Sequence, residues 1–182
     1  MKKYSFRPYD KRFPSYFRYE KVKLSRILPF AKNIEHIGST AVPGLGGKGI
    51  LDVYMTVPKV KIRLLEKIMV EAGYSFMHSQ MDEDGLRLMF KKVYTHRKES
   101  RVVHVHVAEN GSRNFEECLI FRDNLRKNKK LVQEYEAIKI KATKDEQLKK
   151  EKQDSKESLD KAKKIYMKFK EPFIVKYSWR RV

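Results

Sequence analysis

Apolar residues recur along this chain with two different periods, and these periods predict both helices and strands. Over Ser15–Leu28, apolar side chains return every three to four residues, which is typical of an amphipathic helix. The mostly apolar run Ile50–Val57, closed by Pro58, is typical of a buried strand. A second helix is expected between Pro58 and Gly73, because the helical period returns there and glycine often ends a helix.

The middle of the chain predicts further strands separated by polar loops. Tyr74–Met77 is expected to form a short strand or turn, followed by a polar loop at Met81–Gly85. Alternating apolar residues predict strands at Leu86–Val93 and Val102–Val107, with the basic loop Tyr94–Arg101 between them. Strands interspersed with helices indicate a fold of the α/β (α+β) class.

The C-terminal part is expected to be mainly helical. Asn114 is a suitable N-cap for a helix, and the charged or polar segment Lys141–Lys163 predicts a long, exposed helix or helix pair. Pro172 is expected to stop the last helix, which leaves Phe173–Trp179 as an edge strand or a tail. We therefore expect a single domain over residues 1–182, in which residues 141–182 form a charged helical extension.

Composition narrows the location of the protein. The chain has 182 residues and one cysteine, Cys118, so it cannot form an intramolecular disulfide and a reducing compartment is expected. No apolar run approaches the roughly 18 residues of a membrane span, and the first residues lack the apolar core of a signal peptide. These features favour a cytoplasmic protein without a membrane partner.

The charge balance allows two interpretations. A formal net charge of +19 and a pI near 9.9 suggest a polyanionic partner such as RNA. Lysines interspersed with Glu and Asp along predicted helices fit a solvated helix surface equally well. The sequence contains no RNA-binding fingerprint, zinc finger or basic-zipper pattern that would decide between them.

A glycine-rich turn separates a short apolar segment around residues 34–37 from the strand Ile50–Val57. Gly44-x-Gly46-x-x-Gly49 matches the dinucleotide-binding pattern, but it leads into a strand, whereas that motif must open a helix. Gly47-Lys48 suggests a P-loop, but the first glycine and the Ser or Thr after the lysine are both missing. A third pattern remains, which is a Gly-Ser turn followed by a strand carrying a carboxylate.

That third pattern resembles the nucleotidyltransferase superfamily and, within it, the GrpB family. Glu35–Leu45 matches the family's Glu-His-Ile-Gly-Ser-Thr-Ala-Val-Pro-Gly-Leu without a gap, and Lys48 and Asp52 fall in place. A weaker resemblance extends over residues 9–140 and includes a His-x-His strand followed by a Gly-Ser loop and a helix. The resemblance implies a nucleotidyltransferase-like mixed sheet flanked by helices. It also implies that a nucleoside triphosphate is the donor of a nucleotidyl group.

The resemblance and the chemistry of phosphate transfer point to a set of site residues. Backbone N–H groups and a hydroxyl in the Gly-Ser turn can hold phosphate oxygens, and Lys48 can add a positive charge. Asp52 and Ser39 are the catalytic candidates. The residues expected to bind the nucleotide and its phosphates are Gly38, Ser39, Thr40, Lys48, Tyr54 and Arg122.

A divalent metal is the expected cofactor, either Mg²⁺ or Mn²⁺, or else Zn²⁺. Asp52 is the obvious carboxylate ligand, and strand alternation puts His104 and His106 on one face as further ligands. Histidine nitrogens suit Zn²⁺, Mn²⁺ or Ni²⁺ better than Mg²⁺. Tyr54 departs from the related pattern, because it stands where the second carboxylate belongs. A phenol is neutral at pH 7 and is a poor ligand for Mg²⁺.

Structural explanations compete with each of these roles. The Gly-Ser segment could be only a turn, Asp52 could pair with Lys48 or a histidine, and both histidines could be hydrogen-bonded strand residues. The leading function is nucleotidyl transfer to an unknown acceptor. The alternative is a catalytically impaired nucleotide- or RNA-binding protein of the same fold. A third possibility is a structural or dimerising protein that uses its charged C-terminal helix, and the sequence leaves the oligomeric state open.

Overall fold

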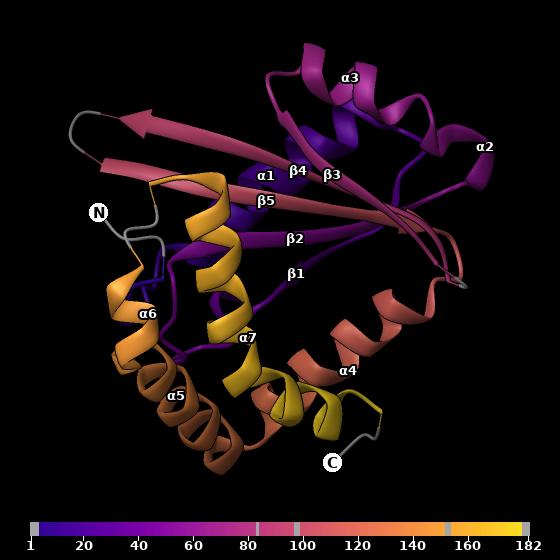
Figure 1. The fold of residues 1–182 in the computed structure, drawn as a ribbon. Helices are drawn as coiled ribbons and strands as arrows, with labels where there is room; N and C mark the ends of the chain where they lie inside the picture. Colours follow the sequence, from indigo (N-terminus) through magenta and orange to yellow (C-terminus); the bar gives the residue numbers. More distant parts are fainter. Residues whose placement is uncertain (1–3, 83, 97–98, 152–153, 180–182) are drawn as a thin grey trace.

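A mixed five-stranded sheet forms the centre of the residues that the computed structural model describes, which are 4–82, 84–96, 99–151 and 154–179 (Figure 1). The strands lie in the order β1-β2-β5-β4-β3. Their bounds are Lys32–Ile37 for β1, Ile50–Val57 for β2, Ser75–Asp82 for β3, Gly85–His96 for β4 and Glu99–Glu109 for β5. β2 and β5 are parallel, and the other neighbouring pairs are antiparallel. The expected mixed sheet is therefore confirmed.

Helices cover both faces of this sheet (Figure 1). One face carries α1 (Phe13–Ile27), α2 (Lys59–Ile62) and α3 (Leu65–Glu71). The other carries α4 (Arg113–Lys127), α5 (Lys129–Lys144), α6 (Glu146–Lys150) and α7 (Lys156–Ser178). A single 3₁₀ turn, η1 (Ser39–Ala41), follows β1. Among the described residues, no helix has both the length and the apolar character that a membrane span needs.

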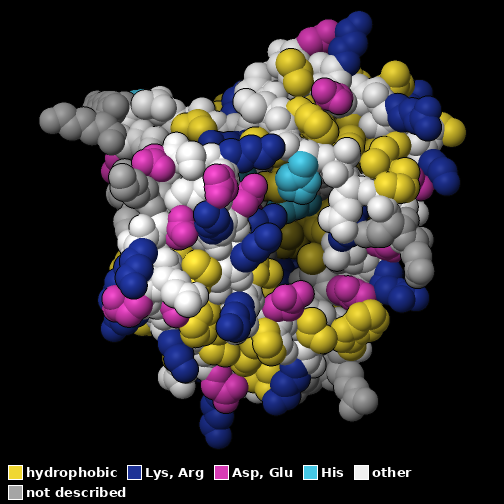
Figure 2. All heavy atoms as spheres, in the orientation of Figure 1, with side chains coloured by type: hydrophobic (Ala, Val, Ile, Leu, Met, Phe, Trp, Pro, Cys, Tyr) yellow, Lys and Arg dark blue, Asp and Glu magenta, His cyan; other side chains and the backbone are white. Residues whose placement is uncertain are grey.

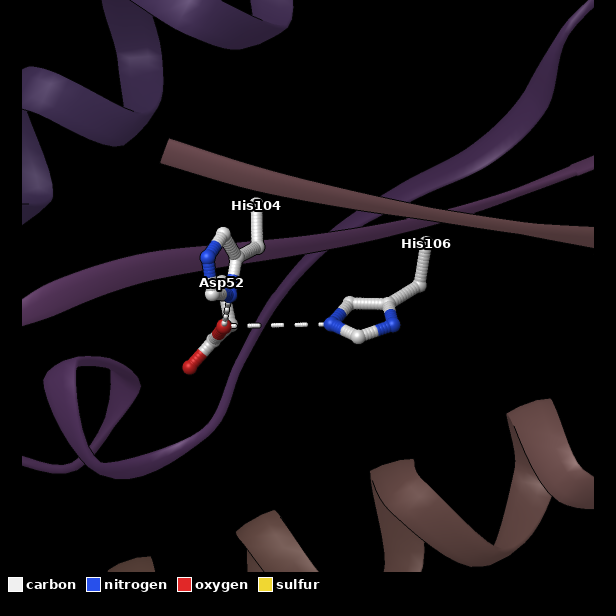
Figure 3. Close-up of side chains that lie close together, drawn as sticks. All are labelled: Asp52, His104 and His106. Carbon is white, nitrogen blue, oxygen red and sulfur yellow. Dashed lines mark ion pairs between the residues drawn. The ribbon is translucent and has the colours of Figure 1, made fainter. Parts of the chain in front are cut away.

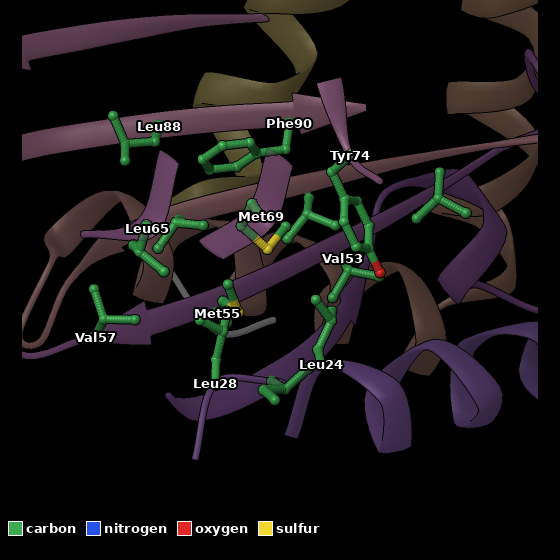
Figure 4. Close-up of a cluster of buried hydrophobic side chains, with 14 of the residues drawn as sticks. Leu24, Leu28, Val53, Met55, Val57, Leu65, Met69, Tyr74, Leu88 and Phe90 are labelled. Atoms are coloured by element: carbon green, nitrogen blue, oxygen red, sulfur yellow. The ribbon is translucent and has the colours of Figure 1, made fainter. Parts of the chain in front are cut away.

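The alternation of side chains along β2 separates the core from the polar face. Leu51, Val53 and Met55 are fully buried against α1 and α3, together with the apolar residues of β4 and β5 (Figure 4). Each such side chain contributes roughly 1.5–3 kcal/mol when it is withdrawn from water. This core therefore fixes which way β2 faces, and Asp52 and Tyr54 must point toward α4 and α7.

The parallel pairing of β2 with β5 sets the register of the polar residues. Asp52 lies opposite His104, and Tyr54 lies opposite His106. Val103, Val105 and Val107 of β5 point into the core, so both histidines share the other face with Asp52. The expected alternation in this strand is confirmed.

Two loop predictions in the central hairpins were wrong. Most of the basic segment Tyr94–Arg101 is strand, because β4 and β5 continue to pair at Tyr94↔Arg101 and Thr95↔Ser100. Its tip, residues 97–98, lies outside the described residues. β3 also extends well beyond Met77, so Met81 and Asp82 belong to a strand rather than to a loop. Cross-strand pairing keeps these segments in the sheet although they contain many charged and polar residues.

The C-terminal predictions need three corrections. Ser112 caps α4 in place of Asn114, since its Oγ accepts a hydrogen bond from the Phe115 N–H. Lys141–Lys163 is helical but is neither continuous nor wholly exposed, because Leu148 and Ala162 are buried.

Pro172 lies inside α7 and does not end it, so the expected edge strand or tail at Phe173–Trp179 is helix as far as Ser178. Phe173, Ile174 and Tyr177 pack against Val42, Leu45 and Tyr135. This packing offsets the hydrogen bond that proline removes.

Candidate functional site

The Gly-Ser turn and the carboxylate of Asp52 lie in direct contact. Gly38 has φ +70° and ψ −170°, a conformation that is essentially restricted to glycine. A methyl group at this position would lie 2.6 Å from Asp52 Oδ2. Gly38 is therefore required both by its backbone and by its closeness to the carboxylate.

Asp52, His104 and His106 form one cluster on the polar face of the sheet (Figure 3). Asp52 Oδ1 lies 3.4 Å from His104 Nδ1 and 3.8 Å from His106 Nε2. Burial tends to raise the pKa of the Asp52 carboxyl, but the two histidines outweigh it and hold that pKa well below its usual value. Asp52 is thus a carboxylate at neutral pH.

The spacing of the three side chains suits one metal ion. Their donor atoms all lie within 4.8 Å of one another. Ligands at about 2.0–2.2 Å around a tetrahedral ion are separated by roughly 3.4 Å, so little movement is needed. Two imidazoles and one carboxylate make a donor set that favours Zn²⁺ or Mn²⁺ over Mg²⁺.

A cavity of about 230 Å³ opens beside Asp52, between the Gly-Ser turn and helices α4, α5 and α7. Because Lys48, Lys139 and Lys170 line it, we call it the lysine cavity. Its lining includes Gly38, Ser39, Gly47, Lys48, Asp52, Arg122, Tyr135, Lys139, Tyr166 and Lys170. Figure 2 shows this side of the molecule, where histidine side chains border a hollow that has lysine and arginine side chains around it. The cavity is therefore positively charged, with one carboxylate in its wall.

Lys139 and Lys170 give the cavity its unusual electrostatics. Lys139 is only 2% exposed, and burial together with the nearby charge of Lys170 lowers its pKa to about 7. Burial and the charge of Lys48 lower the pKa of Lys170 to about 8. Within the described part of the chain, neither ammonium group forms an ion pair with a carboxylate. Grouped cations of this kind favour a bound anion.

The side chains of Ser39 and Lys139 both approach Gly47 in the wall of this cavity. A methyl group on Gly47 would lie 2.5 Å from Ser39 Oγ and 3.4 Å from Lys139 Nζ. The hydroxyl and the ammonium group therefore converge on the same backbone. Lys48 lies over the rings of Tyr4 and Tyr166, at 4.8 and 5.7 Å from the centroids.

Two further predicted residues, Thr40 and Arg122, are buried and contact other residues of the chain. Thr40 is buried, and its Oγ1 lies 2.9 Å from His36 Nε2. Arg122 borders the cavity, but its Nη1 lies 2.6 Å from Glu35 Oε2 and donates to the His36 carbonyl oxygen at 3.1 Å. Arg122 therefore joins α4 to β1, and a contact with nucleotide remains a prediction.

Tyr54 lies beneath α4 and outside the lining of the lysine cavity. It is 3% exposed, its hydroxyl donates a 2.9 Å hydrogen bond to Asn114 Oδ1, and Phe115 packs edge-on against its ring. With His106 it borders a separate recess of about 80 Å³. Direct contact between Tyr54 and a nucleotide remains a prediction that would require α4 to move.

The sequence interpretation missed Lys139 and Lys170. Both belong to lysine-rich helices, in which no feature of the pattern distinguishes a buried lysine from an exposed one. The available signal was the spacing of aromatic residues, since Tyr135 and Tyr166 each precede one of these lysines by four positions, on the same helix face.

Known proteins resemble this chain in sequence. A UPF0157 protein of Streptomyces coelicolor is 35% identical over 120 residues, which are 65% of this chain and 59% of the relative. A UPF0157 protein of Vibrio cholerae is 32% identical over 128 residues, or 70% of this chain and 63% of the relative. The chain thus spans less than two thirds of the length of these relatives.

Solved structures resemble this chain in fold. The crystal structure of conserved protein GrpB from Enterococcus faecalis covers 97% of this chain and 100% of its own, with 28% identity and a TM-score of 0.65. The Cid1 poly(U) polymerase with MgGTP bound has 14% identity and a TM-score of 0.55, covering 78% of this chain and 46% of its own. The second likeness confirms the nucleotidyltransferase-like fold. A family model described as GrpB protein matches residues 3–180, and the chain therefore belongs to the GrpB family.

Proposed function

We propose that this protein binds a nucleoside triphosphate in the lysine cavity and transfers its nucleotidyl group to an acceptor. One observation carries the proposal, which is the position of Asp52. Its carboxylate belongs to the wall of the cationic cavity and also lies within 4 Å of both histidines. A phosphate-binding surface and a set of metal ligands therefore meet at a single side chain.

Each part of the site has a separate task in this proposal. Lys48, Lys139 and Lys170 neutralise the triphosphate, and the Gly38–Ser39 turn offers backbone N–H groups and a hydroxyl to its oxygens. Asp52, His104 and His106 would hold a divalent metal. Such an ion supplies Lewis-acid stabilisation of charge on phosphoryl oxygens. The chain's own contribution is to fix the phosphates beside Asp52.

The structural neighbours support a triphosphate as the ligand. Two of the solved Cid1 structures are described as bound to MgGTP and as a complex with the UTP analog UMPNPP, with TM-scores of 0.55 and 0.53. The likeness is one of fold, so the identity of the base and the acceptor comes from experiment.

A second candidate function is nucleotide binding without transfer, and Tyr54 is the observation that favours it. Two-metal transfer depends on carboxylates that hold both ions. Here the residue two positions after Asp52 is a buried phenol whose hydroxyl is already bonded to Asn114. The cluster therefore offers ligands for one ion.

Radiolabelled nucleotides separate the two functions. The purified chain is incubated with each α-³²P-labelled nucleoside triphosphate and with Mg²⁺, Mn²⁺ or Zn²⁺, and labelled product and pyrophosphate are measured. Binding of the same nucleotides is followed by calorimetry. Transfer predicts pyrophosphate release that requires a metal, with Mn²⁺ or Zn²⁺ more effective than Mg²⁺.

Substitutions then test the site itself. Asp52→Asn should abolish turnover and weaken Mn²⁺ binding at least tenfold, whereas Glu66→Gln, an exposed carboxylate on α3, should change neither. Nucleotide binding without turnover would favour the second candidate. If Asp52→Asn retains wild-type affinity for both metal and nucleotide, the site is misplaced and both candidates fail.

A further inference from the structure

A second hollow shares none of its described lining residues with the lysine cavity. It has a volume of about 910 Å³ and runs between residues 7–10, the first turns of α1 and the outer ends of β4 and β5. Four aromatic side chains line it, namely Phe13, Tyr16, Tyr19 and Tyr94. Tyr19 is 59% exposed, so its ring is available to a ligand.

The guanidinium group of Arg101 stacks on two of these aromatic rings. Its guanidinium carbon lies 4.1 Å from the ring centroid of Tyr16 and 4.7 Å from that of Tyr94. The rings hold the guanidinium in place and leave its N–H groups for in-plane hydrogen bonds. Its Nε is buried and has no hydrogen-bond partner among the described residues. A buried donor without a partner indicates a missing acceptor.

The charges along the groove favour an anionic ligand. Arg7, Arg12 and Arg101 line it together with two carboxylates, Asp10 and Glu99. Arg12 pairs with both carboxylates, at 2.9 Å from Asp10 and 3.2 Å from Glu99. The acidic groups are thus compensated within the groove, and the chain as a whole carries a net charge of +19.

We propose that this groove binds single-stranded nucleic acid. Bases stack on aromatic side chains whatever their identity, and arginines contact the phosphates between them. A groove that combines an exposed tyrosine with a stacked arginine carrying a free donor offers both contacts. Duplex nucleic acid keeps its bases stacked internally, so it cannot use the aromatic side chains.

A pair of hydrogen-bonded backbone segments connects the groove with the lysine cavity. Arg7 and Gly47 form an antiparallel bridge, in which Arg7 N–H donates to the Gly47 carbonyl at 2.7 Å and Gly47 N–H donates back at 2.8 Å. Arg7 lines the groove, whereas Gly47 lines the cavity. Binding to the groove requires no transfer chemistry, so this proposal stands or fails independently of the proposed function.

Fluorescence anisotropy tests the proposal with the full chain. The probe is a fluorescein-labelled 12-nucleotide single-stranded RNA of mixed sequence, with the matching DNA and the RNA duplex as further probes. We expect binding at 50 mM KCl that weakens at least about tenfold at 200 mM KCl, because bound phosphates release counterions. The duplex should bind at least about tenfold more weakly than the single strand.

Two pairs of variants identify the surface. Tyr19→Ala and Arg101→Gln should each weaken binding about tenfold, whereas Tyr19→Phe keeps the ring and should retain wild-type affinity. Trp179→Ala removes an aromatic residue that is 57% exposed outside the groove, and Arg63→Gln removes an exposed arginine near α3. Both controls should bind as the parent does. Circular dichroism melting establishes that each variant is folded.

Several outcomes would overturn the proposal. The first is that neither single strand binds at 50 mM KCl, and the second is that duplex and single strand bind equally well. The third is that the control variants lose as much affinity as the groove variants do. Calorimetric titration of Tyr19→Ala with ATP distinguishes an effect in the groove from an effect in the lysine cavity. An ATP affinity equal to that of the parent shows that a loss of RNA binding arises in the groove.

Discussion

The ammonium group of Lys139 donates a hydrogen bond to the backbone carbonyl of Gly46, joining α5 to the loop that precedes β2. This contact ties the glycine-rich loop to a helix far away in the sequence. It also buries a cation that has a second cation, Lys170, as its neighbour. The cavity therefore places two cations side by side, an arrangement that a bound anion would stabilise.

The first prediction concerns the pH dependence of anion binding. The pKa values of Lys139 and Lys170, lowered to about 7 and about 8, rise when a polyphosphate binds, because the anion favours the charged form. Binding should therefore take up protons, and affinity for tripolyphosphate should fall about tenfold or more between pH 6.5 and pH 9. Calorimetry in buffers of different ionisation enthalpy measures both quantities.

Lys139→Met and Lys141→Met form a matched pair for this measurement. Lys139 faces the cavity, whereas Lys141 is an exposed residue of the same helix. The Lys139 variant should bind tripolyphosphate at least tenfold more weakly with a shallower pH dependence, and the Lys141 variant should resemble the parent. Affinity that does not change from pH 6.5 to pH 9 in the parent would contradict a lysine-based anion site.

The second prediction uses the glycines of the central loop. Gly38→Ala places a methyl group against the Asp52 carboxylate, whereas Gly44→Ala, also at positive φ, meets no atom within 4 Å. Both changes carry the backbone cost of about 1–2 kcal/mol, and only the first displaces Asp52. Mn²⁺ titration should therefore show at least tenfold weaker binding for Gly38→Ala alone. Equal metal affinity in the two variants would show that Gly38 is not needed to position Asp52 for metal binding.

The third prediction concerns acid stability. His36 is buried, and burial, followed by the positive charge of Arg126, lowers its pKa from 6.5 to about 4. Between pH 6.5 and pH 4 the unfolded chain therefore binds a proton that the folded chain does not. Stability is intact above pH 6.5, and it falls by about 3 kcal/mol as the pH drops to 4.

Urea unfolding at pH 7.5 and pH 4.5 measures this loss. His36→Gln should be less stable than the parent at pH 7.5, because the stacking on Phe17 is lost, but it should show a smaller decrease at pH 4.5. His96→Gln replaces an exposed histidine and should keep the full decrease of the parent. An unchanged decrease in the His36 variant would assign the acid sensitivity to other groups.

The fourth prediction concerns Tyr54. Tyr54→Phe removes the hydrogen bond to Asn114 and should cost about 1 kcal/mol of unfolding free energy. Because the hydroxyl lies under α4 and outside the lysine cavity, the affinity for ATP should not change. Thermal unfolding and ATP titration measure the two effects. A large loss of ATP affinity would show that Tyr54 contacts nucleotide after α4 has moved.

The strands that carry Asp52, His104 and His106 could be predicted from the local pattern. Alternation alone puts His104 and His106 on one face, and the apolar run of β2 fixes the face of Asp52. The family resemblance implied that these strands are neighbours, but their parallel register is known only from the structure, because sequence spacing does not reveal it. The physical reason for success is that a buried strand tolerates only one orientation of its polar residues.

Residues whose role depends on packing between distant segments could not be predicted. The sequence around Lys139 and Lys170 is as rich in lysine as the sequence around the exposed lysines of α5 and α7. Pro172 was expected to end a helix, yet the apolar residues after it pack against the loop near Leu45 and extend α7. Tertiary contacts outweighed local propensity in both cases. The long β4–β5 hairpin has the same origin, since cross-strand pairs stabilise its polar residues.

The order in which the walls of the lysine cavity are synthesised has a consequence for the nascent chain. The Gly-Ser turn and Asp52 leave the ribosome early, whereas Lys170 and the rest of α7 follow more than a hundred residues later. A nucleotide that binds there as proposed would therefore not stabilise the sheet while the sheet is being made. The apolar face of β2 against α1 and α3 must hold the early part of the chain by itself. If the cavity binds nucleotide as proposed, that binding would require α7 to have been made, because α7 supplies Lys170 to the cavity wall.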